Sequence, residues 1–215
     1  DTPSAELSAA PKRERTVSAA KPYTAILDQQ AAESRKKMAA LRKKTRNPAN
    51  NQKMEKRLVA TLESVRSSRE CREFCCRMLR RLGTCYSVGA LEHLLDEPEL
   101  AHMARFAMQG MDCEKVDPVL RRALGRVDGE LKVGIINTIG ARGDRKAVPR
   151  LAELLSAKND DVVHAAIEAL GRIGGKKADG VLADADVPQT LEDDLAHARI
   201  ECVEDLPAKR ARVVY

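Results

Sequence analysis

An internal repeat of about 30 residues constrains the fold of this chain more than any other feature. A repeat of this length indicates a stack of similar units, so it has to be identified before any local pattern is interpreted. Its clearest unit covers residues 147–174. Pro149 falls in the first turn of one expected helix. Asn159 or Asp160 can cap a second helix, and Gly174 can end it in the left-handed conformation. The unit therefore predicts two helices joined by a short turn.

Residues of the same kind recur at the same place in successive units and fix the register of the repeat. A shift of 31 residues places Pro149 on Pro118 and Gly171 on Gly140. Further shifts extend the pattern over residues 52–206. One helix pair cannot bury its apolar face alone, whereas stacked pairs share a continuous core. We therefore predict an all-α fold, a right-handed α-solenoid (superhelix) of about five stacked antiparallel helix pairs.

Composition agrees with closely packed helices. Hydrophobic residues make up 43% of the chain and charged residues 33%, which is typical of a soluble globular protein. Aromatic residues are only 2%, and Trp is absent, so the core must be aliphatic and rich in alanine. No run approaches the roughly 18 apolar residues that a membrane-spanning helix needs, so we expect no membrane insertion.

Two stretches of the clearest unit carry a resemblance to a known family: Ala147-Val-Pro-Arg-Leu-Ala-Glu-Leu-Leu155 and Ala165-Ala-Ile-Glu-Ala-Leu-Gly-Arg-Ile-Gly174. They resemble HEAT-like repeats of the type found in phycobilisome lyases. The segment 99–142 is similar to large bacterial HEAT-repeat proteins that are often fused to other modules. The resemblance implies a non-catalytic scaffold that binds a partner protein. A bilin-lyase-like subunit that handles a chromophore is an alternative.

Composition also divides the chain into four parts. Few large apolar side chains occur near the start, so the first part cannot offset the entropy of ordering. The chain opens on Asp1, which suggests trimming or excerpting. We predict a disordered basic arm at 1–22, a basic helix and linker at 23–48, the HEAT-like solenoid at 49–206 and a C-terminal tail at 207–215.

Positive charge is concentrated at the front of the chain. Residues 1–82 hold 20 Lys and Arg against 9 Asp and Glu, a net +11 in a chain of net +6. Such a surface can neutralise nucleic-acid phosphates or an acidic partner. Nucleic-acid binding through the front of the chain is therefore a second alternative. The candidate contacts are Arg35, Lys36, Lys37, Arg42, Lys43, Lys44 and Arg46.

The second helix of each pair is the best candidate for the partner surface. In HEAT-like solenoids this helix usually lines the concave face, as the resemblance implies. His102 and His164 lie two repeats apart at equivalent positions. Phe106 is expected to be an exposed aromatic anchor among polar residues. The predicted partner-binding row comprises Arg77, His102, Phe106, Asn137, His164 and Glu168.

Catalytic and metal-binding patterns are not evident, and we predict no catalytic residue, metal or cofactor. HEAT-like deoxyhypusine hydroxylases hold iron with His-Glu pairs, but Met103 and Ala165 follow the two histidines here. The protein is thus more consistent with a binding module than with an enzyme. Oligomeric state and partner identity are not indicated.

Six cysteines are scattered through expected helices and turns, without the density of a disulfide scaffold. We expect all six to be reduced. Cys71, Cys75 and Cys76 lack the second pair that a structural zinc site needs, so we interpret them as small core residues. The start of the chain does not indicate a compartment, and a cytoplasmic location is favoured.

Overall fold

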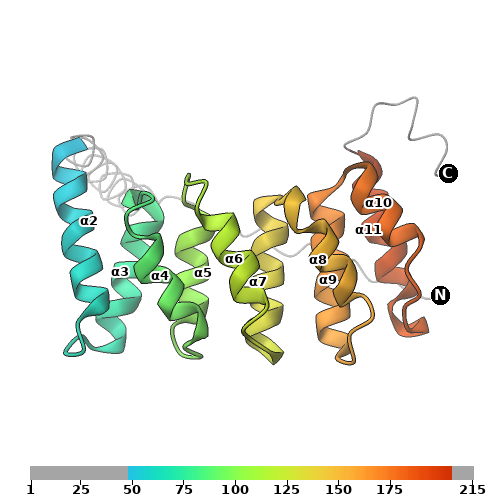
Figure 1. Cartoon of the computed structure of the whole chain (residues 1–215), viewed down its shortest axis with the longest axis horizontal. Helices are drawn as coiled ribbons and strands as arrows, with labels where there is room; N and C mark the ends of the chain where they lie inside the picture. Colours follow the sequence, from blue (N-terminus) through green and yellow to red (C-terminus); the bar gives the residue numbers. More distant parts are fainter. Residues whose placement is uncertain (1–47, 205–215) are drawn as a thin grey trace, which may run out of the picture. The chain divides into compact units, whose positions relative to one another are not determined.

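The computed structural model describes residues 48–204, in which ten α-helices follow one another as five consecutive pairs (Figure 1). We call the first helix of a pair an A helix and the second a B helix. The A helices are α2 (Pro48–Glu63), α4 (Val88–His93), α6 (Val116–Leu124), α8 (Val148–Leu154) and α10 (Gly175–Ala183). The B helices are α3 (Arg69–Leu82), α5 (Ala101–Gln109), α7 (Gly129–Arg142), α9 (Asp160–Ile173) and α11 (Glu192–Glu204). The predicted all-α solenoid is confirmed.

The fourth pair, α8 and α9, forms at the residues whose sequence signals predicted helix starts and ends. Pro149 lies in the first turn of α8. The side-chain oxygen of Asn159 accepts a hydrogen bond from the backbone N–H of Asp161 at 2.9 Å and caps α9. Gly174 ends α9 with φ 64° and ψ −179°, so its conformation is not the left-handed helical one that we predicted. Its positive φ still favours glycine.

Close contacts between B helices hold the stack together. α7 and α9 pack more extensively than any other two helices of this region. A Cβ added at Gly140 of α7 would lie 2.8 Å from the Cα of Ala169 of α9. A Cβ at Gly171 would lie 3.0 Å from the Cα of Ala198 of α11. The largest fully buried side chains are aliphatic or Met: Leu79, Leu91, Leu95, Met108, Leu120, Ile135, Ile136, Ile139, Leu151, Ile167, Leu170 and Leu182.

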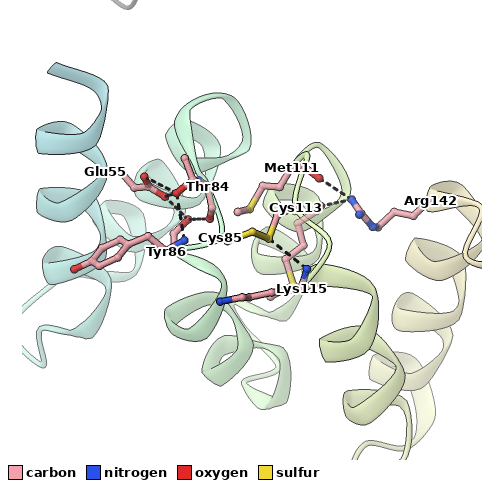
Figure 2. The surroundings of a disulfide bond; sticks show 10 residues. Glu55, Thr84, Cys85, Tyr86, Met111, Cys113, Lys115 and Arg142 are labelled. Carbon is pink, nitrogen blue, oxygen red and sulfur yellow. Dashed lines mark hydrogen bonds between the residues drawn. A yellow bond between two sulfur atoms is a disulfide. The ribbon is translucent and has the colours of Figure 1, made fainter. Parts of the chain in front are cut away.

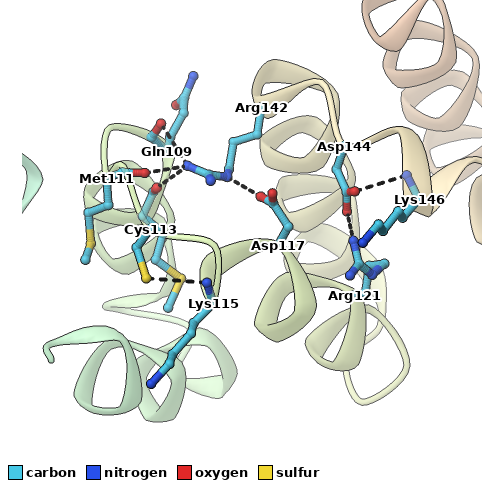
Figure 3. Close-up of polar contacts among 10 residues, drawn as sticks. Gln109, Met111, Cys113, Lys115, Asp117, Arg121, Arg142, Asp144 and Lys146 are labelled. Atoms are coloured by element: carbon cyan, nitrogen blue, oxygen red, sulfur yellow. Dashed lines mark hydrogen bonds and ion pairs between the residues drawn. The ribbon is translucent and has the colours of Figure 1, made fainter. Parts of the chain in front are cut away.

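One arginine joins three successive helices (Figure 3). Nη1 of Arg142, at the end of α7, donates to the carbonyl oxygens of Met108 and Met111, each at 2.9 Å. These carbonyls lie at and just beyond the C-terminus of α5, where no intrahelical donor remains. Nε of Arg142 lies 2.5 Å from a carboxylate oxygen of Asp117 in α6. The orientation of α5 against α6 and α7 is therefore set partly by this side chain.

A buried carboxylate fastens α2 to the turn between α3 and α4 (Figure 2). Glu55 is 2% exposed. It accepts hydrogen bonds from the backbone N–H of Thr84 at 2.6 Å, from the Thr84 hydroxyl at 3.0 Å and from the Ser87 hydroxyl at 3.0 Å. Burying a carboxylate costs free energy unless such donors surround it. The position of α2 therefore depends on these bonds.

We expect Glu55→Gln to lower the free energy of unfolding by about 2 kcal/mol. The amide keeps the shape of the side chain, but it removes the charge and turns an N–H₂ group toward donors. Urea unfolding followed by circular dichroism measures the change. Glu63→Gln, an exposed position on the same helix, is the matched control, and equal midpoints for the two variants would contradict the role of Glu55.

The expectation that all six cysteines are reduced is wrong, because Cys85 and Cys113 form a disulfide (Figure 2). Cys85 lies between α3 and α4, and Cys113 lies between α5 and α6. Their separation of 28 residues is about one repeat, so stacking brings the two loops together, with 5.4 Å between the Cα atoms. The bond therefore links two successive repeats. The cytoplasmic location that the sequence favours stays a prediction.

Several predictions concern residues 1–47 and 205–215, which lie outside the described residues. They include the arm at 1–22, most of the basic segment 23–48 and the tail at 207–215. The predicted phosphate or acidic-partner contacts Arg35, Lys36, Lys37, Arg42, Lys43, Lys44 and Arg46 lie there as well. In residues 48–204, no helix combines the length and the apolar character needed to cross a membrane.

Candidate functional site

All six residues of the predicted partner-binding row lie on B helices. We call the solvent-accessible side of the B helices the B face. Arg77 belongs to α3, His102 and Phe106 to α5, Asn137 to α7, and His164 and Glu168 to α9. The repeat of about 30 residues therefore distributes the row over four successive B helices. The structure divides these six residues into a central group and a flanking group.

The flanking residues form exposed ion pairs within the B layer. Such pairs contribute little to stability, because water screens them. Each of these three side chains nevertheless has a polar partner of its own within the B layer. The pairs are Arg77 with Glu73 (3.8 Å, α3), Glu168 with Arg172 (2.6 Å, α9) and, when the imidazole is protonated, His164 of α9 with Asp194 of α11 (3.4 Å).

The central residues line a cavity of about 310 Å³ between α5 and α7. His102, Phe106 and Asn137 are three of its wall residues, so the structure brings half of the predicted row into one site. The row members Arg77, His164 and Glu168 are not part of the wall. All wall residues belong to B helices; the others are Arg105, Gln109, Gly134, Thr138, Ala141 and Arg172.

The expectation that Phe106 is an exposed aromatic is wrong. Its side chain is half-buried, and the guanidinium carbon of Arg80 lies 4.0 Å from the centroid of its ring. A cation over an aromatic face is attracted by the ring's electron density. The ring therefore serves as a wall of the cavity with Arg80 stacked on it. Larger exposed aromatic surfaces occur at Phe74 and Tyr86.

Arg105 is one of the six wall residues that the sequence prediction missed. It follows the buried Ala104 on α5, and its guanidinium lies across Gly134 of α7. A Cβ at Gly134 would lie 2.2 Å from the guanidinium carbon, so only glycine leaves room for the group in this position. The signal was present in the sequence: Gly134 follows Arg105 by 29 residues, which is one repeat.

Two buried polar atoms of the cavity wall have no hydrogen-bond partner among residues 48–204. They are Nη1 of Arg105 and Oδ1 of Asn137. Burial lowers the pKa of the Arg105 guanidinium from its ordinary value. The group still carries a full positive charge near neutral pH, because arginine is not deprotonated in proteins. The wall of the cavity thus contains both a charged donor and an amide acceptor.

Cys75 and Cys76 of α3 are buried thiols. Burial, reinforced by the neighbouring Cys71, raises the pKa of the Cys75 thiol to about 11, and burial raises that of Cys76 to about 12. Both thiols are therefore protonated and unreactive near neutral pH. Within the described region, no group of three or more His, Cys, Asp or Glu side chains is placed to hold a metal ion.

The family model for HEAT repeats matches residues 116–198, from the start of α6 into α11. These residues form a HEAT-repeat domain. No curated protein matches the chain. The HEAT-repeat domain supplies the α7 and α9 residues of the cavity, including Asn137 and Gly134. Arg105 and Phe106 come from α5, in the helix pair that precedes the matched segment. The cavity therefore lies between the HEAT-repeat domain and the repeat before it.

Proposed function

We propose that the HEAT-repeat domain and the helix pairs before it form a non-catalytic scaffold that binds a partner protein on the B face. HEAT repeats are generally protein-interaction scaffolds. Their stacked helices present a long surface instead of a single pocket, which suits extended partners. The identity of the partner is a separate question, because a fold does not by itself determine what is bound.

The cavity between α5 and α7 is the observation that carries this proposal. It combines an aromatic wall at Phe106 with buried polar atoms of Arg105 and Asn137. The residues that dominate binding at protein interfaces are often aromatic or arginine side chains in centrally placed pockets. Larger hollows border the A helices, between α8 and α10 and between α4 and α6, but neither has an aromatic side chain in its wall.

The unequal packing of the two layers adds support. Neighbouring B helices pack more extensively than neighbouring A helices. A stack with one tighter layer curves toward that layer, so a partner can contact several B helices at once. The close approaches at Gly140 and Gly171 bring α7, α9 and α11 together in the B layer. The B face is therefore the surface on which we expect a partner to bury the most area.

Selection of peptide ligands from a random displayed library against the full chain tests the proposal. We expect most selected peptides to lose binding to the triple variant Phe106→Ala, Asn137→Ala and His164→Ala. The matched control changes two exposed positions of α8 and one in the turn that follows it: Arg150→Ala, Glu153→Ala and Ser156→Ala. Neither triple variant alters the net charge when histidine is neutral.

Circular dichroism establishes that both variants are folded before binding is compared. Peptides that bind the B-face variant as well as they bind the original chain would overturn the proposal. Equal loss of binding in both variants would also overturn it, because the binding would then not belong to the B face.

A further inference from the structure

The guanidinium of Arg105 lacks a counter-charge in the part of the chain that the structure describes. No hydrogen bond or ion pair joins this guanidinium to another residue of 48–204, and its Nη1 is buried without a partner. None of the wall residues of the cavity is Asp or Glu. By contrast, Arg142, Arg121 and Arg172 each pair with a carboxylate. Arg105 is thus set apart from the structural arginines of the stack.

A guanidinium nitrogen that is buried without a partner, as Nη1 of Arg105 is, is unfavourable unless another group completes it, because burial removes the water that would otherwise solvate it. The fold nevertheless accommodates it, since Gly134 leaves the space that the guanidinium occupies. The unpaired Oδ1 of Asn137 lies in the same wall. Among the described residues, none supplies an anion for Arg105 or a donor for Oδ1 of Asn137.

We propose that this cavity binds a Glu or Asp side chain from an acidic segment of the partner protein, with its carboxylate paired to Arg105. The inference rests on the proposed function, because it names the chemistry of the partner at the same site. A planar guanidinium matches a carboxylate through two parallel hydrogen bonds. A main-chain N–H of the same segment supplies the donor that Asn137 lacks. Phe106 and Ala141 line the cavity and offer an apolar surface to the methylene groups.

Size and charge favour a single acidic side chain as the occupant. A cavity of about 310 Å³ admits a side chain but no folded element. The wall contains Arg105 and no Asp or Glu, so its unpaired charge is positive. The segments of this chain outside the described residues carry more Lys and Arg than Asp and Glu. Charge therefore favours a partner segment over these segments.

The hollow between α9 and α11 has acidic side chains in its wall, in contrast to the cavity between α5 and α7. The preference for a carboxylate is therefore confined to one part of the B face. Its wall contains Glu168, Asp194 and Glu201 together with Arg172 and His197. Carboxylates placed there would be repelled. An acidic side chain bound to the B face is therefore directed to the cavity between α5 and α7.

Fluorescence anisotropy with labelled peptides tests the proposal on the full chain at physiological ionic strength. The probe alternates Gly and Glu, and a matched peptide alternates Gly and Gln. We expect the glutamate peptide to bind more tightly than the glutamine peptide, and Arg105→Met to weaken glutamate binding by roughly tenfold or more. Methionine keeps a long stem over Gly134 and removes the charge. Arg150→Met removes an exposed arginine of α8 and is expected to leave binding unchanged.

Arg105→Lys provides a second variant that retains the charge, in case the methionine variant does not fold. We expect intermediate affinity, because an ammonium group lacks the planar fork. Equal glutamate binding by Arg105→Met and the original chain would overturn the proposal. A peptide of alternating Gly and phosphoserine that requires Arg105, when the glutamate peptide does not, would also overturn it.

Failure of this inference can be distinguished from failure of the proposed function. If library peptides depend on Phe106, Asn137 and His164 but glutamate peptides ignore Arg105, the scaffold proposal stands and the acidic occupant is wrong. If neither set of peptides depends on these residues, both proposals fail.

Discussion

Replacing Gly140 with valine is expected to lower the free energy of unfolding by about 3 kcal/mol or more, because the new side chain has no space between α7 and α9. Even a Cβ at this position would lie 2.8 Å from the Cα and 2.9 Å from the Cβ of Ala169. A backbone atom cannot move aside as the end of a flexible side chain can. The two helices must therefore separate, and the core between them loses its close packing.

Gly180→Val is the matched control for this substitution. Gly180 lies within α10, and nothing lies within 4 Å of a Cβ built there. The same chemical change should be close to neutral at this site, since glycine inside a helix is itself unfavourable. Thermal and urea unfolding of the two variants measure the difference. Similar losses at both positions would show that the contact with Ala169 is not the cause.

Loss of the disulfide between Cys85 and Cys113 is expected to lower the free energy of unfolding by roughly 3.5 kcal/mol, from the entropy of the loop it closes. The loop spans 28 residues and includes α4 and α5. Without the bond, the unfolded chain gains conformations that the cross-link forbids. The double variant Cys85→Ala and Cys113→Ala, compared with the original chain by urea unfolding, measures the effect.

A reductant supplies the control for this prediction. Dithiothreitol should lower the unfolding midpoint of the original chain toward that of the double variant. It should leave the double variant unchanged, although Cys71, Cys75, Cys76 and Cys202 are all still present. A reductant that leaves the original chain unaffected would contradict a stabilising role for the bond.

Much of the architecture could be predicted from the register of the repeat. The five pairs follow the apolar spacing, because helices with one apolar stripe must stack to bury it. Local signals at Pro149 and Asn159 placed helix starts correctly. The conformation of Gly174 was predicted less well, since a positive φ can be followed by either a helical or an extended ψ, and the following helix decides between them.

The candidate site was predicted only in part. His102, Phe106 and Asn137 share the cavity because equivalent positions of α5 and α7 become neighbours on stacking. Arg105 was missed, because arginine next to buried alanines is normally a solvent-exposed residue. Phe106 was predicted to be exposed, but the guanidinium of Arg80, on a neighbouring helix, lies over its ring.

The sequence by itself determined the helices, their order and the continuous aliphatic core, because these follow from spacing along one chain. The tertiary structure decided which side chains meet across repeats. Cys85 meets Cys113, Glu55 meets Thr84 and Arg105 lies against Gly134, each pair 28 or 29 residues apart. A register of about 30 residues brings such positions into the same neighbourhood. Only the separation and rotation of the packed helices determine whether two atoms bond, and apolar spacing does not specify either quantity.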